Sequence, residues 1–238
     1  MQLAPPSSPR PAPGHLADAL ARARDELGSR PAVTVYGPER RDEQGIVSLA
    51  QWAAKGASLL ELDLLLEPGD RLRVDLDPGW PLVAVALAAW WAGVAVTLDG
   101  DAPAAVVQEG RRAPTTADDV LWIGASVDGA PVAEVVGEAW VSAVQSFPDQ
   151  PPPPRAAAEL PAIVTARRVL TQAEVLTAAA SLLGAGGTLG LDADTDLPSE
   201  LVLVALAARP LLAARPTVLL QPGVPRSAAD GEKVAHWA

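Results

Sequence analysis

Residues 71–98 read RLRVDLDPGWPLVAVALAAWWAGVAVTL, and this stretch decides the fold of the chain. Strict alternation over Arg71–Asp77 predicts a strand with one apolar face and one charged face. The apolar run that follows predicts a helix over Trp80–Trp91 with Asp77 as its cap, and then a buried strand over Val94–Leu98. A strand, a helix and a strand in this order predict a parallel α/β sheet.

The segment before residue 71 also predicts helices and strands in turn. Apolar spacing, turn residues and capping residues predict a helix over Leu16–Leu27 stopped by Gly28, a strand over Ala32–Tyr36, a polar loop over Gly37–Gly45, a helix over Leu49–Leu60 capped by Ser48, and a turn over Glu67–Asp70.

The segment after residue 98 continues the pattern on both sides of a proline-rich stretch. It predicts strands over Ala104–Val107 and Val120–Ile123, a helix over Glu134–Val144, a strand over Ile163–Thr165, a helix over Gln172–Leu183, a strand over Thr188–Leu191, a helix over Ser199–Leu212 and a strand over Thr217–Leu220.

The domain organisation is predicted from the proline-rich stretch. Residues 146–161 read SFPDQPPPPRAAAELP, and four consecutive prolines make a stiff connector that cannot join a central sheet. We therefore expect a first α/β lobe over 15–145 and a smaller second one over 162–222. Residues 1–14 are proline-rich and expected to be disordered, and residues 223–238 are expected to form a loose tail.

The composition of the chain excludes two classes of binding partner. The 238 residues carry a net charge of −11, which repels phosphate backbones and anionic lipid headgroups, so we expect neither nucleic acid nor a membrane as partner. The longest apolar run, Leu82–Leu98, contains Gly93 and is interpreted as a buried helix and strand. The chain has no Cys, which excludes thiolate chemistry and fits a cytoplasmic protein without a secretory signal.

A family resemblance rests on three segments in familiar order: RPAVTVYG from residue 30, VSLAQWAAKGASLLE from residue 47, and EPGDRLRVDL with its following helix and strand from residue 67. Together they resemble the N-terminal part of the adenylate-forming enzymes, the AMP-binding superfamily of acyl-CoA synthetases, luciferases and adenylation domains. The resemblance implies two similar α/β lobes. Because the family's catalytic body is about twice as long, we interpret the chain as a truncated member.

The family's phosphate-binding loop is not found. Its place, by resemblance, is Pro161–Thr171, which reads PAIVTARRVLT and has neither the Gly residues nor the Lys of that loop. Arg167 and Arg168 are candidate phosphate contacts and Thr171 a candidate helix-entry hydroxyl, although solvent-exposed charges at a helix entry are an alternative interpretation. The family's adenine, ribose and catalytic-lysine motifs are also absent, so no catalytic residue is transferred and no ATP or AMP cofactor is expected.

Two other motifs are candidates for chemistry. Asp192, Asp194 and Asp196 imitate the start of a calcium loop, but Leu197 and Leu203 occupy the positions of its Gly and Glu, so an acidic turn before a helix is the alternative. The glycine-rich residues 182–191 lack the G-x-G-x-x-G spacing and follow a helix, which favours a helix stop and turn.

The leading functional hypothesis is a non-catalytic relative of the family, a pseudoenzyme with a binding, regulatory or scaffolding role. Its partner would be a small molecule in the cleft between lobes, a second copy or another protein, with the charged face of Arg71–Asp77 as the first place to look. The alternative is an adenylate-forming enzyme with a degenerate site or a site completed by a partner chain. A plain nucleotide-binding module would need a glycine-rich strand-to-helix turn, which is not visible.

Overall fold

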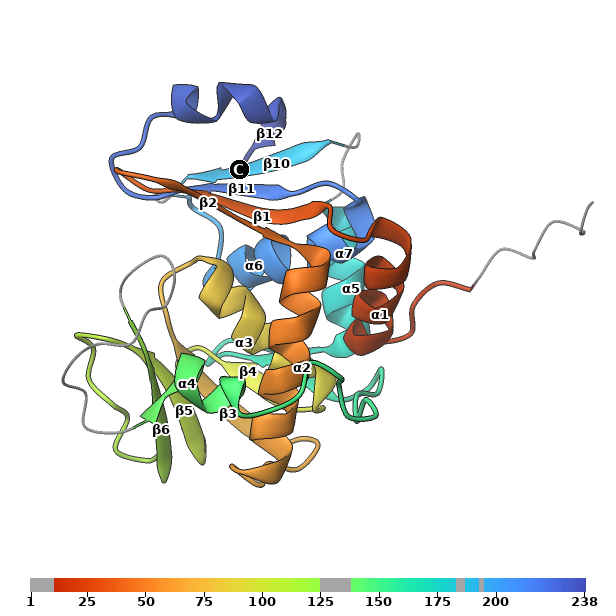
Figure 1. Ribbon diagram of the computed structural model, residues 1–238, viewed down its shortest axis with the longest axis vertical. Helices are drawn as coiled ribbons and strands as arrows, with labels where there is room; N and C mark the ends of the chain where they lie inside the picture. The colour runs from red at the N-terminus through yellow and green to blue at the C-terminus, as the bar shows by residue number, and fades with distance from the viewer. Residues whose placement is uncertain (1–10, 125–137, 183–186, 193–194) are drawn as a thin grey trace, which may run out of the picture.

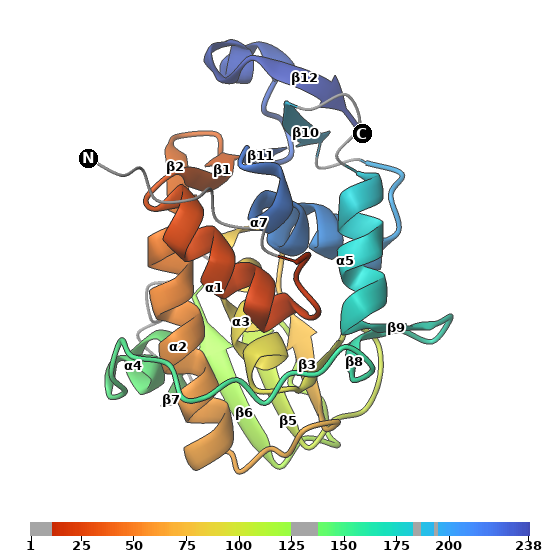
Figure 2. The same ribbon diagram turned by 90° about the vertical axis from the view of Figure 1, so that its right-hand side faces the viewer.

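The computed structural model describes residues 11–124, 138–182, 187–192 and 195–238. Helices α1, α2, α3, α5, α6 and α7 lie between two β-sheets, one towards each end of the long axis (Figures 1 and 2). Helix α3 contacts β1 of one sheet and both β3 and β4 of the other. The helical layer is therefore the common core on which both sheets pack.

The larger sheet has seven strands in the order β7-β6-β5-β3-β4-β8-β9, and every neighbouring pair except β8–β9 is parallel. Its strands are β3 (Arg71–Asp75), β4 (Ala95–Thr97), β5 (Ala104–Gln108), β6 (Asp119–Ile123), β7 (Glu138–Ala139), β8 (Pro161–Val164) and β9 (Val169–Thr171).

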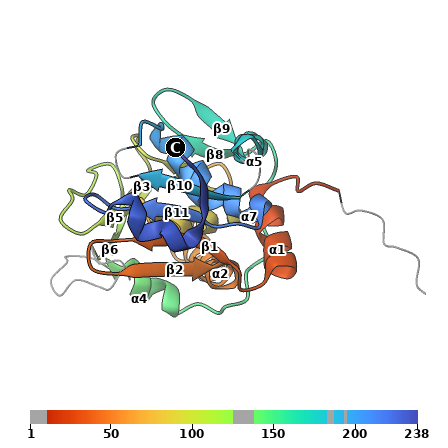
Figure 3. The same ribbon diagram turned by 90° about the horizontal axis from the view of Figure 1, so that it is seen from above.

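The smaller sheet has five strands in the order β12-β10-β11-β1-β2, of which only β1 and β2 pair antiparallel. Figure 3 looks down on this sheet, which spreads over the helices below. Its strands are β1 (Pro31–Tyr36), β2 (Arg41–Gly45), β10 (Thr188–Asp192), β11 (Thr217–Leu220) and β12 (Val234–Trp237). The predicted α/β class with mostly parallel sheets is confirmed.

The helices follow the apolar periodicity of the sequence. They are α1 (Leu16–Leu27), α2 (Ile46–Leu62), α3 (Trp80–Trp91), α4 (Trp140–Gln145), α5 (Gln172–Ser181), α6 (Ser199–Leu203) and α7 (Arg209–Ala213), with a π-helical turn η1 (Val204–Ala208) joining the last two and a 3₁₀ helix η2 (Arg226–Glu232) near the C-terminus.

Helices α2 and α3 pack closely at the centre of the core. A Cβ built on Gly56 of α2 would lie 2.6 Å from the Cβ of Ala88 on α3, so only glycine allows this approach. A buried polar link joins three helices nearby: the Gln172 side chain of α5 accepts from the backbone N–H of Leu16 and donates to the carbonyl of Trp90, each at 3.0 Å. These contacts fix α1, α3 and α5 against one another.

Several local predictions need correction. Residues 41–45 form the edge strand β2 and not a loop, because β1 supplies their hydrogen-bonding partner. Helix α2 begins at Ile46 after Gly45, and the Ser48 hydroxyl bonds instead to Gln44 at 2.7 Å. Helix α3 is preceded by Gly79 without a side-chain cap, since the carboxylate of Asp77 is held by neighbours on β5 and its following loop.

The division into consecutive lobes also needs correction. The seven-stranded sheet takes β8 and β9 from beyond the proline-rich stretch, and the five-stranded sheet joins β1 and β2 to strands from the last quarter of the chain. Residues 146–161 therefore do not separate two sequential lobes at 15–145 and 162–222. They run along the larger sheet, where the Trp91 indole donates to the carbonyl of Pro152 at 2.9 Å.

The expected loose tail, residues 223–238, is ordered into η2 and β12. Strand β12 pairs with β10, and the Trp237 ring packs over Gly190, where a Cβ would come within 2.3 Å of it. The expectation for residues 1–14 falls largely outside the described residues, as does most of the first half of the expected helix over Glu134–Val144.

Candidate functional site

A cleft of about 770 Å³ opens where strands of both sheets end at their carboxyl ends. Its walls come from the ends of β3 and β5 in the larger sheet and of β10 and β11 in the smaller sheet, with Leu82 of α3 and Val202 of α6 between them. Ligands of open parallel α/β sheets bind at the carboxyl ends of the strands. The position and the volume make this cleft the candidate site.

The wall formed by the larger sheet carries a closed polar network. Arg111 forms ion pairs with Asp75 and Asp77, which follow one another on the charged face of β3 and its extension. Gln108, the last residue of β5, donates to the Asp77 carboxylate at 2.7 Å and accepts from the Asp77 backbone N–H at 2.6 Å. The two aspartates of the charged face predicted from residues 71–77 are therefore satisfied by a polar cluster.

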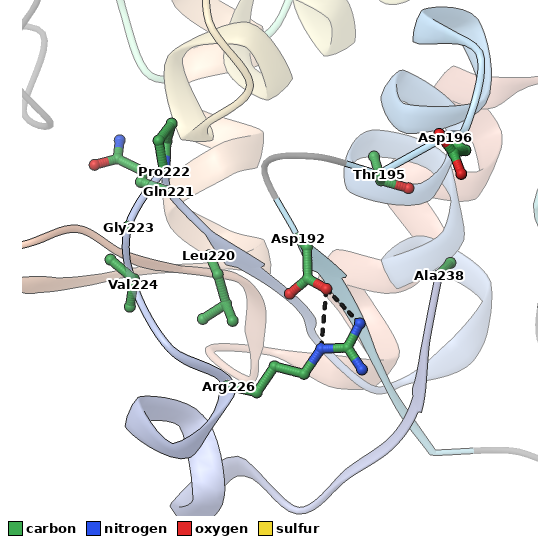
Figure 4. A pocket seen from close by; sticks show the side chains of 10 residues that line it. All are labelled: Asp192, Thr195, Asp196, Leu220, Gln221, Pro222, Gly223, Val224, Arg226 and Ala238. Carbon is green, nitrogen blue, oxygen red and sulfur yellow. Dashed lines mark hydrogen bonds and ion pairs between the residues drawn. The ribbon is translucent and has the colours of Figure 1, made fainter.

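The opposite wall carries a second ion pair, which continues into an adjoining hollow of about 320 Å³ (Figure 4). Asp192, at the end of β10, accepts from the guanidinium of Arg226, with a distance of 2.9 Å from Nε. The guanidinium carbon also lies 5.0 Å from the centre of the Trp237 ring, within range of a cation–π contact. Hydrogen bonding to Asp192 raises the pKa of Arg226.

Of the three aspartates proposed as a calcium loop, the structure describes two, and both line the hollow of Figure 4. Asp192 is engaged by Arg226, Asp196 lines the hollow beside it, and Asp194 lies outside the described residues. No group of three or more His, Cys, Asp or Glu side chains that could hold a metal ion occurs among the residues described.

The phosphate candidates lie on the β8–β9 hairpin and at the start of α5. Arg168 forms an ion pair with the buried Glu200 at 3.0 Å, and Arg167 occupies the exposed turn. Thr171 caps α5 in a reciprocal arrangement with Glu174, whose pKa its hydrogen bonds lower. Arg167, Arg168 and Thr171 thus lie on one hairpin and the helix start that follows it, but none is among the described residues that line the cleft.

The turn between β8 and β9 binds a carboxylate of the chain itself. The backbone N–H of Ala166 donates to both oxygens of Asp99, each at 3.0 Å. The next two N–H groups, of Arg167 and Arg168, donate to the Thr165 hydroxyl at 3.3 and 3.2 Å, and the Thr165 N–H donates to the Arg168 carbonyl. Every N–H of this four-residue turn therefore has an internal acceptor.

Sequence reasoning missed most of the cleft residues. Gln108, Arg111, Gln221 and Arg226 were not candidates, because each is an ordinary polar residue at a strand end or in a loop. The one available signal was the charged face of β3, which required partners of opposite charge. Asp99 gave no signal, since its partner lies 67 residues away.

The sequence and the fold were compared with those of known proteins. No protein-family model matches the chain. A curated protein of Mycobacterium tuberculosis (strain ATCC 25618 / H37Rv), named TIGR03089 family protein, is 35% identical over 161 residues, which make up 67% of this chain and 58% of that protein. The chain therefore spans less than two thirds of the length of this relative.

Three solved structures share the fold. A Brucella canis acyl-CoA synthetase matches with a TM-score of 0.74 at 16% identity, over 92% of this chain and 46% of that one. A Mycobacterium tuberculosis fatty acyl CoA synthetase gives 0.68 at 15%, over 94% and 49%. A fatty acyl-adenylate ligase from L. pneumophila, in complex with acyl adenylate and pyrophosphate, gives 0.63 at 15%, over 88% and 40%.

These matches define the class of fold: the chain has the α/β architecture of the N-terminal subdomains of adenylate-forming enzymes. The resemblance predicted from residues 30–98 is confirmed at the level of the fold, and the match covers most of this chain but under half of each solved structure. Among the described residues, no helix has the length and apolar character needed to cross a membrane.

Proposed function

We propose that the chain is a member of the adenylate-forming superfamily that binds a small ligand in the cleft between its sheets and does not itself adenylate a substrate with ATP. The observation that carries this proposal is the turn between β8 and β9. By resemblance, this is the place of the family's phosphate-binding loop, and here the N–H of Ala166 is taken by Asp99.

A phosphate cradle needs backbone N–H groups that point at the ligand and a site that favours negative charge. In this hairpin the N–H groups of residues 165–168 all bond within the protein. The Asp99 carboxylate adds a negative charge at the position that a phosphate oxygen would occupy, and like charges at contact distance repel. Both effects oppose the binding of ATP phosphates.

The positive charges near this turn do little to offset the repulsion of phosphate. Arg168 is paired with Glu200, and Arg167 is exposed, where a single ion contact contributes about 1 kcal/mol or less. The net charge of −11 adds a long-range repulsion towards a polyanion. We therefore assign the chain a binding or regulatory role, and the absence of cysteine supports a cytoplasmic location.

The alternative function is ATP-dependent acyl activation with phosphate-binding groups supplied by a partner chain. The names of the three solved structures favour it, because they are acyl-CoA synthetases and an acyl-adenylate ligase. The two functions differ in what the chain alone does with ATP and in whether a partner changes that result.

Thermal unfolding in the presence of ATP·Mg²⁺, AMP and a non-hydrolysable acyl-adenylate mimic tests the proposal. A ligand at 100 times its dissociation constant stabilises a protein by about 2.7 kcal/mol, which is easily detected. We expect no concentration-dependent rise in Tm with ATP·Mg²⁺. A saturable rise with ATP·Mg²⁺, or exchange of pyrophosphate into ATP in the presence of a carboxylic acid, would refute the non-catalytic assignment.

A further inference from the structure

The cleft offers two kinds of wall to a ligand. Its apolar part is formed by side chains from both sheets and from α3 and α6, among them Val74, Leu82, Leu98, Val202, Leu203 and Leu219. Its polar part lies at the strand ends and continues into the adjoining hollow. A volume of about 770 Å³ is in the range of sites for drug-sized molecules, so an amphipathic ligand with one apolar end fits this division.

The polar part carries an excess of negative charge. Four carboxylates, of Asp75, Asp77, Asp192 and Asp196, line the cleft and its adjoining hollow, against the guanidinium groups of Arg111 and Arg226. Both arginines are already ion-paired, Arg111 with two of these carboxylates and Arg226 with a third.

An anionic headgroup would have to displace a carboxylate from one of these arginines. Of the other side-chain donors in the cleft, the Gln108 amide is occupied by Asp77, and the hydroxyls of Thr195 and Ser199 carry no positive charge. At Asp196 a cationic headgroup meets no such competition, because this carboxylate has no ion pair within the described residues. A carboxylate is a suitable acceptor for an ammonium group.

We propose that the cleft binds an amphipathic cation, an alkyl chain with an ammonium headgroup, with the chain against the apolar wall and the headgroup at the carboxylates of Asp192 and Asp196. This inference rests on the proposed binding function of the cleft. It separates the ligand of this chain from a carboxylic acid, whose headgroup has the opposite charge.

Isothermal titration at pH 7 with decylammonium, decanoate and decanol, all below their aggregation concentrations, tests the charge preference at constant chain length. We expect decylammonium to bind at least tenfold more tightly than decanoate, with decanol between them, and the preference to shrink as salt is raised. Equal binding of the two ions, or tighter binding of decanoate, would overturn the proposal.

Asp196→Asn is the matched variant, because it removes one charge from the adjoining hollow without breaking an ion pair of the described structure. It should weaken decylammonium binding about three- to fivefold and leave decanol unchanged. Asp63→Asn, an exposed aspartate at the end of α2, is the control and should change neither affinity. An Asp196 variant with unaltered decylammonium binding would refute the assigned headgroup position.

The two proposals fail in different ways. Saturable stabilisation by ATP·Mg²⁺ contradicts the non-catalytic function, whatever alkyl compound the cleft prefers. A preference for decanoate without any response to ATP·Mg²⁺ contradicts only the cationic ligand.

Discussion

Substituting Asp99 with Ala should open the turn between β8 and β9 to an external anion. The carboxylate holds the Ala166 N–H through two contacts of 3.0 Å. A hydrogen bond to a charged group contributes about 1.5–3 kcal/mol when buried, and exposure of Asp99 lowers this towards about 1 kcal/mol. We therefore expect the variant to lose about 1 kcal/mol of unfolding free energy in a buffer without multivalent anions.

The second half of this prediction is a gain of anion binding. With Asp99 removed, the Ala166 N–H and the Arg167 side chain are available to pyrophosphate. At ten times its dissociation constant, a ligand stabilises the folded state by about 1.4 kcal/mol. For a chain of this size, about 2–4 °C of Tm corresponds to 1 kcal/mol, so pyrophosphate should raise the Tm of the variant by roughly 3–6 °C. The wild-type chain should not respond.

Differential scanning fluorimetry over a pyrophosphate series at constant ionic strength gives the readout. Asp101→Ala is the control, because this neighbouring carboxylate bonds to the Thr116 hydroxyl and not to the turn. It removes the same charge from the same loop. If both variants gain the same response, general charge is the cause and the proposed blockage of the turn is wrong. It is also wrong if Asp99→Ala gains none.

Three further predictions concern stability. Replacing Gln172 with Leu leaves the buried Leu16 N–H without its acceptor and removes one of two donors to the Trp90 carbonyl, and it should cost about 1–3 kcal/mol in urea unfolding; no measurable loss would contradict the structural role given to this link. Burial raises the pKa of Glu61 above its ordinary value of 4.5. The ionised side chain therefore lowers the stability of the fold as the pH rises above 4.5, and the loss is complete above the raised pKa. Glu61→Gln should therefore be more stable than the wild type at neutral pH, with the difference vanishing in acid melts; a difference independent of pH would exclude this cause. Gly190→Ala places a methyl group into the Trp237 ring and should release β12, seen as faster proteolytic removal of the last residues; an unchanged cleavage rate would mean that the ring moves aside without unpairing the strand.

The sequence predicted those elements whose signals are local. The bounds of α1 and α3 were correct because Gly28 and Gly93 end them and their apolar residues are close in sequence. Strand β2 was missed because its residues, RDEQG, have no apolar period and are stabilised by pairing with β1 at the sheet edge. The ordered tail was missed for a similar reason, since Gly190 accommodates Trp237 across 47 residues.

The candidate site was harder to predict than the fold. The alternation of residues 71–77 indicated a charged face, but the partners of that face, Gln108 and Arg111, come from the next strand of the sheet and its following loop. The aspartates at the end of β10 were noticed as a motif, yet the role of Asp192 depends on Arg226, which follows only after four further elements, α6, η1, α7 and β11. Side chains that meet through sheet pairing are not encoded in any short stretch of sequence.

The interleaved sheets set the order in which the protein can be assembled during synthesis. Strand β1 pairs with β11, which leaves the ribosome roughly 10–40 s later at ordinary translation rates of about 5–20 residues per second. The seven-stranded sheet has all its strands by Thr171, whereas the hairpin of β1 and β2 must wait with the edge of β1 that later pairs with β11 still open. A nascent chain of this protein therefore carries an unpaired β edge for much of its synthesis, and this edge is where a chaperone, or a wrong partner, would first bind.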